Sequence, residues 1–452
     1  MKPKIITRII TEGDSLTDRG TASKRPILRC FSDLSKSPQG RFTNGYAWSD
    51  HIVARFISEF LIKSFKKKGM EATDISDSIL FGETKIEDAI QHSYSLDNDL
   101  YVKYKGIDFV RSYDEGGLTA HDYRWALSYS PVRFFTRLIL SNLGLKRQKL
   151  LDYDQEQTIP RAQKEQTLII EWSGANDLIT VNARPSHVEA DLAIRARIKN
   201  AEELIKNGYR HFVLFNLPDL SLTPRYQALG GAELENAHEC TDYFNTELAK
   251  ACHELSIMYP HCSIEVFDVN SIFTDAYQNP EQYHFAKSKR EKPYSTSPDF
   301  KINEDGTSPA SGYMFWDDVH PSADMHALLA DIFYEKYARE YNFSAPNKKA
   351  AENEELFISE KKLRAAFVKK YSSLLANQAL NLHPDIEYET ASLESIFKEG
   401  LREETLTHRV ITELQWVNSQ GKLNLNIPAL KEAMARAMAG EERHAEHEAK
   451  CF

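Results

Sequence analysis

The sequence alternates short runs of β-branched and aromatic residues with longer stretches of helical spacing, and this alternation limits the fold most strongly. Strand-sized runs separated by helices are typical of βαβ units, in which the strands are parallel and helices cover both faces of the sheet. The sequence therefore predicts an α/β domain built on a parallel five-stranded sheet. The predicted strands are Ile5–Thr11, Ile107–Tyr113, Thr167–Trp172, His211–Asn216 and Ile264–Val269.

The longest helical pattern between strands runs from Ala47 to Lys68. Apolar residues recur there at helical spacing, and a run of lysines precedes Gly69. Cations suit the carboxyl end of a helix dipole, and glycine suits the left-handed residue that ends a helix. This pattern predicts one helix over residues 47–68.

The chain divides by pattern into two parts. Up to Tyr341, strand and helix signals alternate, with two polar excursions at residues 70–104 and 278–313 that are candidates for lids or binding loops. Beyond Tyr341, the pattern is one of charged helices, such as residues 393–417 and 429–438. We predict a catalytic domain over residues 1–341 and a helical extension over residues 342–452 that serves localisation, partner binding or export.

The composition argues against several kinds of partner. The 452 residues include 56 Lys and Arg against 66 Asp and Glu, a formal net charge of -10, whereas a dedicated nucleic-acid binder needs a basic surface. The five cysteines form no CxxC pair, so neither a disulfide framework nor a zinc site is indicated. We expect no metal, no cofactor and no nucleic-acid partner.

Polar blocks follow the first three predicted strands. They are residues 13–18 (Gly-Asp-Ser-Leu-Thr-Asp), 115–119 (Glu-Gly-Gly-Leu-Thr) and 174–177 (Gly-Ala-Asn-Asp). A fourth block, residues 316–321 (Trp-Asp-Asp-Val-His-Pro), precedes an apolar helix. Open α/β sheets bind ligands at the carboxyl ends of their strands, so we expect these four loops to converge on one edge of the sheet.

The four blocks supply each group that acyl transfer needs. Ser15 is the candidate nucleophile, His320 the candidate base, and Asp317 the carboxylate that fixes the imidazole tautomer. The oxyanion of a tetrahedral intermediate needs preorganised donors. The backbone N–H groups of Ser15 and Gly117 and the carboxamide of Asn176 are the candidates.

Each residue taken alone has a simpler explanation. Ser15 could be a helix N-cap, Asn176 the start of an Asx turn, and His320 a histidine at the start of a helix. All of them falling at the predicted strand ends in this order favours the catalytic interpretation. A G-x-S-x-G elbow is absent from the sequence, which excludes the α/β-hydrolases as the template.

The same blocks resemble the GDSL or SGNH hydrolases, and among them the branch of bacterial phospholipases A and glycerophospholipid:cholesterol acyltransferase-like enzymes. The resemblance spans about residues 5–341 and implies a flavodoxin-like three-layer α/β/α sandwich. It implies Ser15, Gly117, Asn176 and His320 as the signature residues, with Asp317 completing a triad. Further blocks that carry it are Gly40–Gly45 with Trp48, Asn216–Asp219 with Thr223 and Pro224, and Phe315–Pro321.

One block departs from the family pattern. The family has Asn-Tyr-Ala before its glycine pair, whereas this chain has Ser-Tyr-Asp at residues 112–114, followed by Glu115. This departure lies in the loop that carries Gly117. We expect Asp14 and Asp18 to be structural rather than catalytic, and His121 to be a surface or packing histidine.

Together, these features predict a serine esterase that acts on acyl esters of lipids through an acyl-enzyme on Ser15. A phospholipase A or lysophospholipase is the first expectation, with transfer of the acyl group to an acceptor alcohol as a second outcome. The alternatives are a GDSL esterase for acetylated carbohydrate or small esters, and a binding module with a vestigial site. Peripheral membrane contact through the basic segment Lys361–Lys370 is an expectation with an equal rival, a solvated helix packed on the catalytic domain.

The sequence also bears on location. No apolar run approaches the roughly 18 residues of a membrane-spanning helix. Residues 1–10 lack the apolar core and cleavage site of a Sec signal peptide. We expect a soluble protein that is cytoplasmic or exported by a non-Sec route. The charged tail, residues 440–452, resembles the export signals of type IV secreted bacterial effectors.

Overall fold

The computed structural model describes residues 4–24, 34–37, 40–67, 101–104, 107–124, 126, 130–182, 184–304 and 306–346. Most of the first polar excursion, residues 70–100, lies outside this set. So do the predicted helices at residues 393–417 and 429–438, the basic segment at residues 361–370 and the charged tail.

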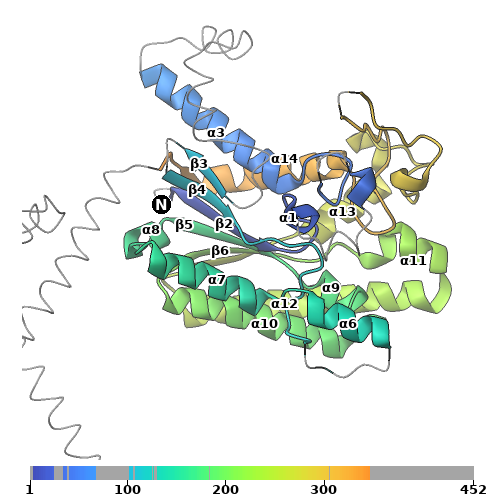
Figure 1. Ribbon diagram of the computed structural model, residues 1–452, viewed down its shortest axis with the longest axis horizontal. Helices are drawn as coiled ribbons and strands as arrows, with labels where there is room; N and C mark the ends of the chain where they lie inside the picture. The colour runs from blue at the N-terminus through green and yellow to red at the C-terminus, as the bar shows by residue number, and fades with distance from the viewer. Residues whose placement is uncertain are drawn as a thin grey trace, which may run out of the picture. The chain divides into compact units, whose positions relative to one another are not determined.

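A six-stranded sheet forms the centre of the fold, in the order β3-β4-β2-β5-β6-β7 (Figure 1). All five predicted strands are present and pair in parallel, with β4 and β5 flanking β2. The predicted count of five is nevertheless one short, because β3 adds an antiparallel edge strand beside β4. The strands are β2 (Arg8–Gly13), β3 (Tyr101–Tyr104), β4 (Ile107–Ser112), β5 (Thr167–Trp172), β6 (His211–Phe215) and β7 (Ser263–Phe267).

The first predicted strand is in fact two strands. β1 (Lys4–Ile6) pairs in parallel with β8 (Tyr341–Phe343) in a separate two-stranded sheet, and only β2 enters the main sheet. The predicted domain boundary at residue 341 therefore falls inside β8, and the first domain continues through Phe343. The ring of Phe343 packs on that of Phe56 at a centroid distance of 3.9 Å. The helical extension itself stays a prediction, because it lies outside the described residues.

Helices cover both faces of the sheet. Figure 1 shows α3 (Trp48–Lys67) and α14 (Ala323–Glu340) on one side, and α7 (Leu143–Glu156), α10 (His187–Lys206) and α12 (Gly231–Met258) on the other. The parallel strands run in the order second, first, third, fourth, fifth along the chain, which is the flavodoxin-like order. The helix predicted over residues 47–68 begins one residue later and ends one residue earlier.

Shorter elements connect these layers. Among the described helices, none combines the length and the apolar character that crossing a membrane would require. The second polar excursion, residues 278–313, contains two short 3-10 turns. The remaining elements are α1 (Thr21–Lys24), η1 (Leu34–Lys36), α6 (Pro131–Ile139), α8 (Arg161–Glu165), α9 (Ala175–Ile179), η2 (Leu220–Leu222), α11 (Pro224–Leu229), α13 (Val269–Gln278), η3 (Pro280–Tyr283) and η4 (Tyr294–Thr296).

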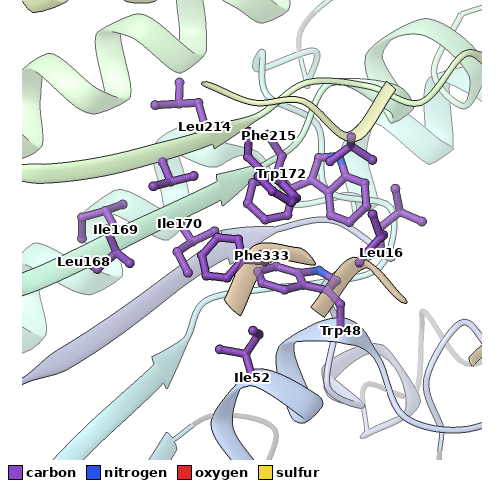
Figure 2. Packing of buried hydrophobic residues seen from close by; sticks show 14 of the residues in the cluster. Leu16, Trp48, Ile52, Leu168, Ile169, Ile170, Trp172, Leu214, Phe215 and Phe333 are labelled. Carbon is purple, nitrogen blue, oxygen red and sulfur yellow. The ribbon is translucent and has the colours of Figure 1, made fainter. Parts of the chain in front are cut away.

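An aromatic cluster joins the helical layer of α3 and α14 to the carboxyl ends of the strands. Phe215 at the end of β6 contacts Trp48, Trp172 and Phe333, with ring centroids 4.7, 5.1 and 5.6 Å away. Figure 2 shows these rings gathered beside Leu16, which follows β2. All four aromatic residues are fully buried, and such pairs contribute packing beyond the area they remove from water. The loops that carry the polar blocks therefore stand on a rigid base.

Candidate active site

The turn that carries Ser15 follows directly from β2. Asp14 closes it, because its carbonyl oxygen accepts the N–H groups of Thr17 and Asp18 and its carboxylate accepts that of Leu16 at 3.0 Å. Gly13 is required for this turn, since a Cβ there would lie 2.6 Å from the hydroxyl of Thr17. Among the described residues, the N–H of Ser15 itself has no hydrogen-bond partner.

Ser15, His320 and Asp317 form one hydrogen-bonded chain. His320 Nε2 lies 2.8 Å from Ser15 Oγ, and His320 Nδ1 lies 2.7 Å from Asp317 Oδ2. The other carboxylate oxygen of Asp317 accepts the backbone N–H groups of Val319 and His320. A carboxylate at Nδ1 favours the tautomer with its proton there, which leaves Nε2 free to accept the serine proton.

The electrostatics of this hydrogen-bonded triad suit proton transfer. Burial alone would lower the pKa of His320, but the charge of Asp317 and its hydrogen bond outweigh burial, and the pKa is raised. Burial alone would raise the pKa of Asp317, but the charge of His320 and the hydrogen bonds from His320 and Val319 together outweigh burial, and that pKa is lowered. Asp317 therefore stays ionised at neutral pH, and His320 is a stronger base than an ordinary histidine.

Three hydrogen-bond donors lie beside the triad and face the same pocket: the backbone N–H groups of Ser15 and Gly117 and the carboxamide of Asn176. Gly117 has a φ of +82° in the loop after β4, and among the described residues its N–H has no partner. The carboxamide of Asn176 donates one N–H to the carbonyl of Leu118 at 3.1 Å and accepts the hydroxyl of Thr180 at 2.6 Å. These two bonds fix which way the amide points and leave its second N–H free.

The structure distinguishes Gly117 from its neighbour. Gly116 donates its N–H to Asp18 at 2.7 Å, so only Gly117 has an available donor in this glycine pair. Asp18 also accepts the N–H groups of Gly20, Thr21 and Ala22. Burial raises the pKa of Asp18 to about 6 although these bonds oppose it. Asp18 thus ties the serine loop to the glycine loop, the structural part expected of it.

The two acidic residues that depart from the family pattern point away from the pocket. Asp114 accepts the hydroxyl of Thr11 at 2.5 Å, and burial raises its pKa to about 8. Glu115 accepts the hydroxyl of Ser141 and forms a buried ion pair with Lys146. Neither carboxylate lines the pocket, so the departure leaves the donors of the loop in place.

His121 takes the packing position that the sequence suggested. Its N–H donates to Asp177, and its ring lies edge-on to that of Tyr123. The side chain of Asp177 also accepts the N–H of Ala120 at 2.8 Å. This pair of bonds holds the end of the glycine loop to the loop after β5.

Sequence reasoning missed the aromatic wall of the site. The ring of Phe42 packs on the imidazole of His320 at a centroid distance of 5.1 Å. The ring of Phe42 also lies against the backbone of Gly116, because a Cβ at Gly116 would be 2.3 Å from the ring. The block at residues 40–45 is one of those that carry the family resemblance, but only the folded protein shows the contact between Phe42 and His320.

A buried ion pair positions that wall. Asp50 on α3 accepts Arg19 Nε at 2.8 Å and Arg41 Nη2 at 3.1 Å, and all three side chains are buried. Charge-assisted bonds of this kind are short and directional. They fasten the segment that carries Phe42 to the loop that carries Ser15.

A pocket of about 540 Å³ opens in front of these groups, within the size range of small-molecule sites. The structure brings all five predicted residues, Ser15, Gly117, Asn176, Asp317 and His320, to its wall. Within the described residues, no cluster of three or more His, Cys, Asp or Glu is placed to hold a metal ion. The apolar part of the lining includes Leu16, Leu34, Phe42, Ile139, Leu140, Ile179, Leu220, Phe273, Phe315 and Trp316, and the charged part comprises Asp14, Lys36, Asp219, Arg225, Asp317 and Asp318.

Comparison with known proteins places the chain in a family. Phosphatidylcholine-sterol acyltransferase of Aeromonas hydrophila is 24% identical over 382 residues, which cover 75% of this chain and 92% of that protein. A GDSL esterase/lipase of Arabidopsis thaliana is 22% identical over 356 residues, covering 73% and 87%. A secreted effector protein of Salmonella typhimurium is 23% identical over 343 residues, covering 75% and 65%.

The family model for GDSL-like lipase/acylhydrolase matches residues 9–333. This span is well over half of the chain, and it includes both Ser15 and His320. The chain therefore belongs to the GDSL-like lipase/acylhydrolase family.

Proposed function

We propose that the protein is a serine esterase that hydrolyses acyl esters of lipids through an acyl-enzyme on Ser15. The observation that carries this proposal is the hydrogen-bonded chain from Asp317 through His320 to Ser15 at the wall of a largely apolar pocket. A binding module with a vestigial site would have no need for an aligned nucleophile, base and carboxylate.

In the first half of the reaction, Ser15 Oγ attacks the ester carbonyl carbon while His320 Nε2 takes the serine proton. The negative charge that develops on the carbonyl oxygen accepts hydrogen bonds from the N–H groups of Ser15 and Gly117 and from Asn176. When the C–O bond to the leaving alcohol breaks, His320 returns its proton to that alcohol. Asp317 stabilises the imidazolium between these two steps.

In the second half, a water molecule attacks the acyl-enzyme and His320 takes its proton. The acyl group leaves as a carboxylic acid, and the proton returns to Ser15 Oγ. An acceptor alcohol in place of water would give acyl transfer, the activity named for the relative in Aeromonas hydrophila. The same residues serve both outcomes, because only the second nucleophile differs.

The pocket supports a lipid substrate. Its apolar lining suits an acyl chain, and its charged part, which includes Lys36 and the ion pair of Arg225 with Asp318, suits a polar head. We infer a phospholipase A or lysophospholipase as the specific activity. Small acetyl esters are the rival substrates, and a rate that rises with acyl-chain length from two to eight carbons would favour lipids over them.

The test is a digest of a defined lipid mixture with the wild-type protein, Ser15→Ala and Ser295→Ala. Ser295 also lines the pocket, which makes its alanine variant a matched control for the loss of one hydroxyl. We expect release of fatty acid by wild type and Ser295→Ala but not by Ser15→Ala. If no lipid class is consumed by any of the three proteins, the lipid esterase proposal fails.

We also propose that the helical extension serves localisation, partner binding or export rather than chemistry. Every candidate catalytic residue precedes it, and one relative is named as a secreted effector. Removal of residues 348–452 tests this division, and activity on a soluble ester should survive it.

A further inference from the structure

The short helix α6 exposes apolar side chains to solvent, which is the reverse of the usual arrangement on a surface helix. A surface helix normally buries its apolar side and exposes its polar side. None of the residues of α6 is buried, and Val132, Phe135 and Leu138 are 73%, 59% and 39% exposed. These three residues form the α6 patch. In Figure 1, α6 lies at the periphery of the molecule, near α9.

The polar side of α6 is the side that is fastened to the protein. The guanidinium of Arg137 donates to the carbonyl oxygens of Ala126 and Val181 and to the carboxamide oxygen of Asn182. These bonds fix the rotation of the helix about its axis. The apolar side therefore faces outward because of specific contacts.

The α6 patch differs from the other exposed apolar residues. Three large hydrophobic side chains on one helix of nine residues make a local cluster, whereas singly exposed apolar residues are ordinary on any protein surface. Apart from the pair Ile257 and Met258 at the end of α12, the other exposed large hydrophobics are scattered along the sequence.

The same helix forms part of the pocket. Thr136, Ile139 and Leu140, in and just after its last turn, line the pocket. Leu140 also packs on the loop that carries Gly117, since a Cβ on Gly117 would lie 2.6 Å from Leu140 Cδ2. The α6 patch is therefore continuous with the wall of the candidate site.

We propose that α6 docks the protein on a lipid surface, with Val132, Phe135 and Leu138 inserted among the acyl chains. An interfacial helix inserts an exposed apolar side among the acyl chains. The α6 patch is such a side, because its three members are all apolar and exposed. This proposal rests on the proposed function, since docking beside the pocket gives an acyl chain a direct path from the membrane to Ser15.

The test measures flotation of the full-length protein with phosphatidylcholine vesicles in a Ser15→Ala background, in which turnover cannot destroy the vesicles. The parent is compared with a Phe135→Ser/Leu138→Ser variant and with a matched control, Ile257→Ser/Met258→Ser. Both pairs are exposed and apolar, and none of the four residues lines the pocket. We expect the α6 variant to lower the ratio of bound to free protein at least about tenfold, and the control to bind as the parent does.

A second readout separates docking from chemistry. With Ser15 restored, both double variants should hydrolyse a soluble butyrate ester within about twofold of wild type, because surface substitutions away from the site change little. If the wild-type protein itself does not hydrolyse the soluble ester, the proposed function is refuted, whereas the vesicle-binding result still stands.

Three results would overturn the docking proposal. The first is a parent protein that does not bind the vesicles. The second is equal binding by the parent and the α6 variant. The third is a dimer that the α6 substitutions convert to a monomer, because the patch would then be covered by a second copy of the chain.

Discussion

At the residue scale, the short contact between Ser15 Oγ and His320 Nε2 makes the two side chains act as one unit. Replacing either residue with alanine should lower kcat by about 10³-fold or more while the fold stays intact. The double variant should be little worse than either single one, because each substitution already removes the proton transfer. Steady-state kinetics on a soluble ester measures this. Multiplicative losses in the double variant would contradict a shared mechanism.

Asn176 offers a separate measure of the oxyanion donors. Asn176→Ala should cost about 2.7 to 4 kcal/mol of transition-state stabilisation with little change in KM, because its free N–H would meet the oxygen only when charge develops there. Thr180→Val should cost less than Asn176→Ala, since it removes one of the two bonds that orient the amide but keeps the donor itself. Near wild-type kcat in Asn176→Ala would reduce this residue to a turn former.

The raised pKa of His320 predicts the direction of the pH profile. The active form carries a neutral imidazole, so kcat/KM should fall as the pH drops through a midpoint above about 6.5, the ordinary value for histidine. Asp317→Asn removes the charge that most raises this pKa and should move the midpoint down, with a loss of about 10⁴-fold in kcat. An unshifted midpoint in Asp317→Asn would mean that another group titrates.

At the element scale, the loop between β4 and α6 depends on one glycine. Gly117→Ala places a Cβ on a backbone with a φ of +82° and 2.6 Å from Leu140 Cδ2, so the backbone is strained and the loop or the Leu140 side chain must shift. Because a misplaced donor costs about 10²-fold in rate, kcat should fall by roughly that amount. Gly230→Ala is the control, since its φ is +62° with no atom within 4 Å, and it should lose about 1 kcal/mol of stability but no activity.

The comparison of these variants needs both thermal unfolding and kinetics. Both alanines should lower the midpoint of unfolding, since each glycine has a positive φ, and Gly117→Ala should lower it more because its Cβ also meets Leu140. Only Gly117→Ala should lose kcat. Equal activity in the two variants would show that the Gly117 N–H takes no part.

The helices and strands differ in how well the sequence predicts them. The five parallel strands and the helix α3 were predictable because each has a strong local signal, either a run of apolar residues or a repeat at helical spacing. β3 was missed because four residues, Tyr-Val-Lys-Tyr, are too short to show a period. The division of Ile5–Thr11 between two sheets depends on β8, which lies far along the chain.

At the scale of the whole molecule, the division of labour between the two parts of the chain can be tested by truncation. A cut after Tyr341, the boundary predicted from the sequence, would remove the buried ring of Phe343 that packs on Phe56 and end the pairing of β8 with β1. The chain should instead be cut just before Lys348, which leaves all of the described residues in place. A protein of residues 1–347 should hydrolyse a soluble short-chain ester within about twofold of the full chain.

That truncation also tests whether the extension contributes to the site. Circular dichroism and thermal unfolding establish that the shortened protein is folded. A folded but inactive protein would show that the extension supplies part of the site, for example as a lid.

The candidate site was more predictable than its surroundings. Ser15, Asn176 and His320 follow or precede elements with clear signals, so chain order alone brings them to one edge of the sheet. Phe42, Arg41 and Asp50 were not predicted as a unit, because their contacts come from folding the segment at residues 40–50 back over the serine loop. The outward apolar side of α6 was equally hidden, since its cause is the anchoring of Arg137 on distant carbonyl groups.

The central claim is that Ser15 is a nucleophile activated by His320. Labelling with a fluorophosphonate, followed by peptide mass spectrometry, tests it most directly, because this reagent forms a stable adduct only on an activated serine. We expect one adduct on Ser15, kept in Ser295→Ala, absent in Ser15→Ala and strongly slowed in His320→Ala. An unlabelled wild-type protein, or an adduct on a different serine, would contradict it.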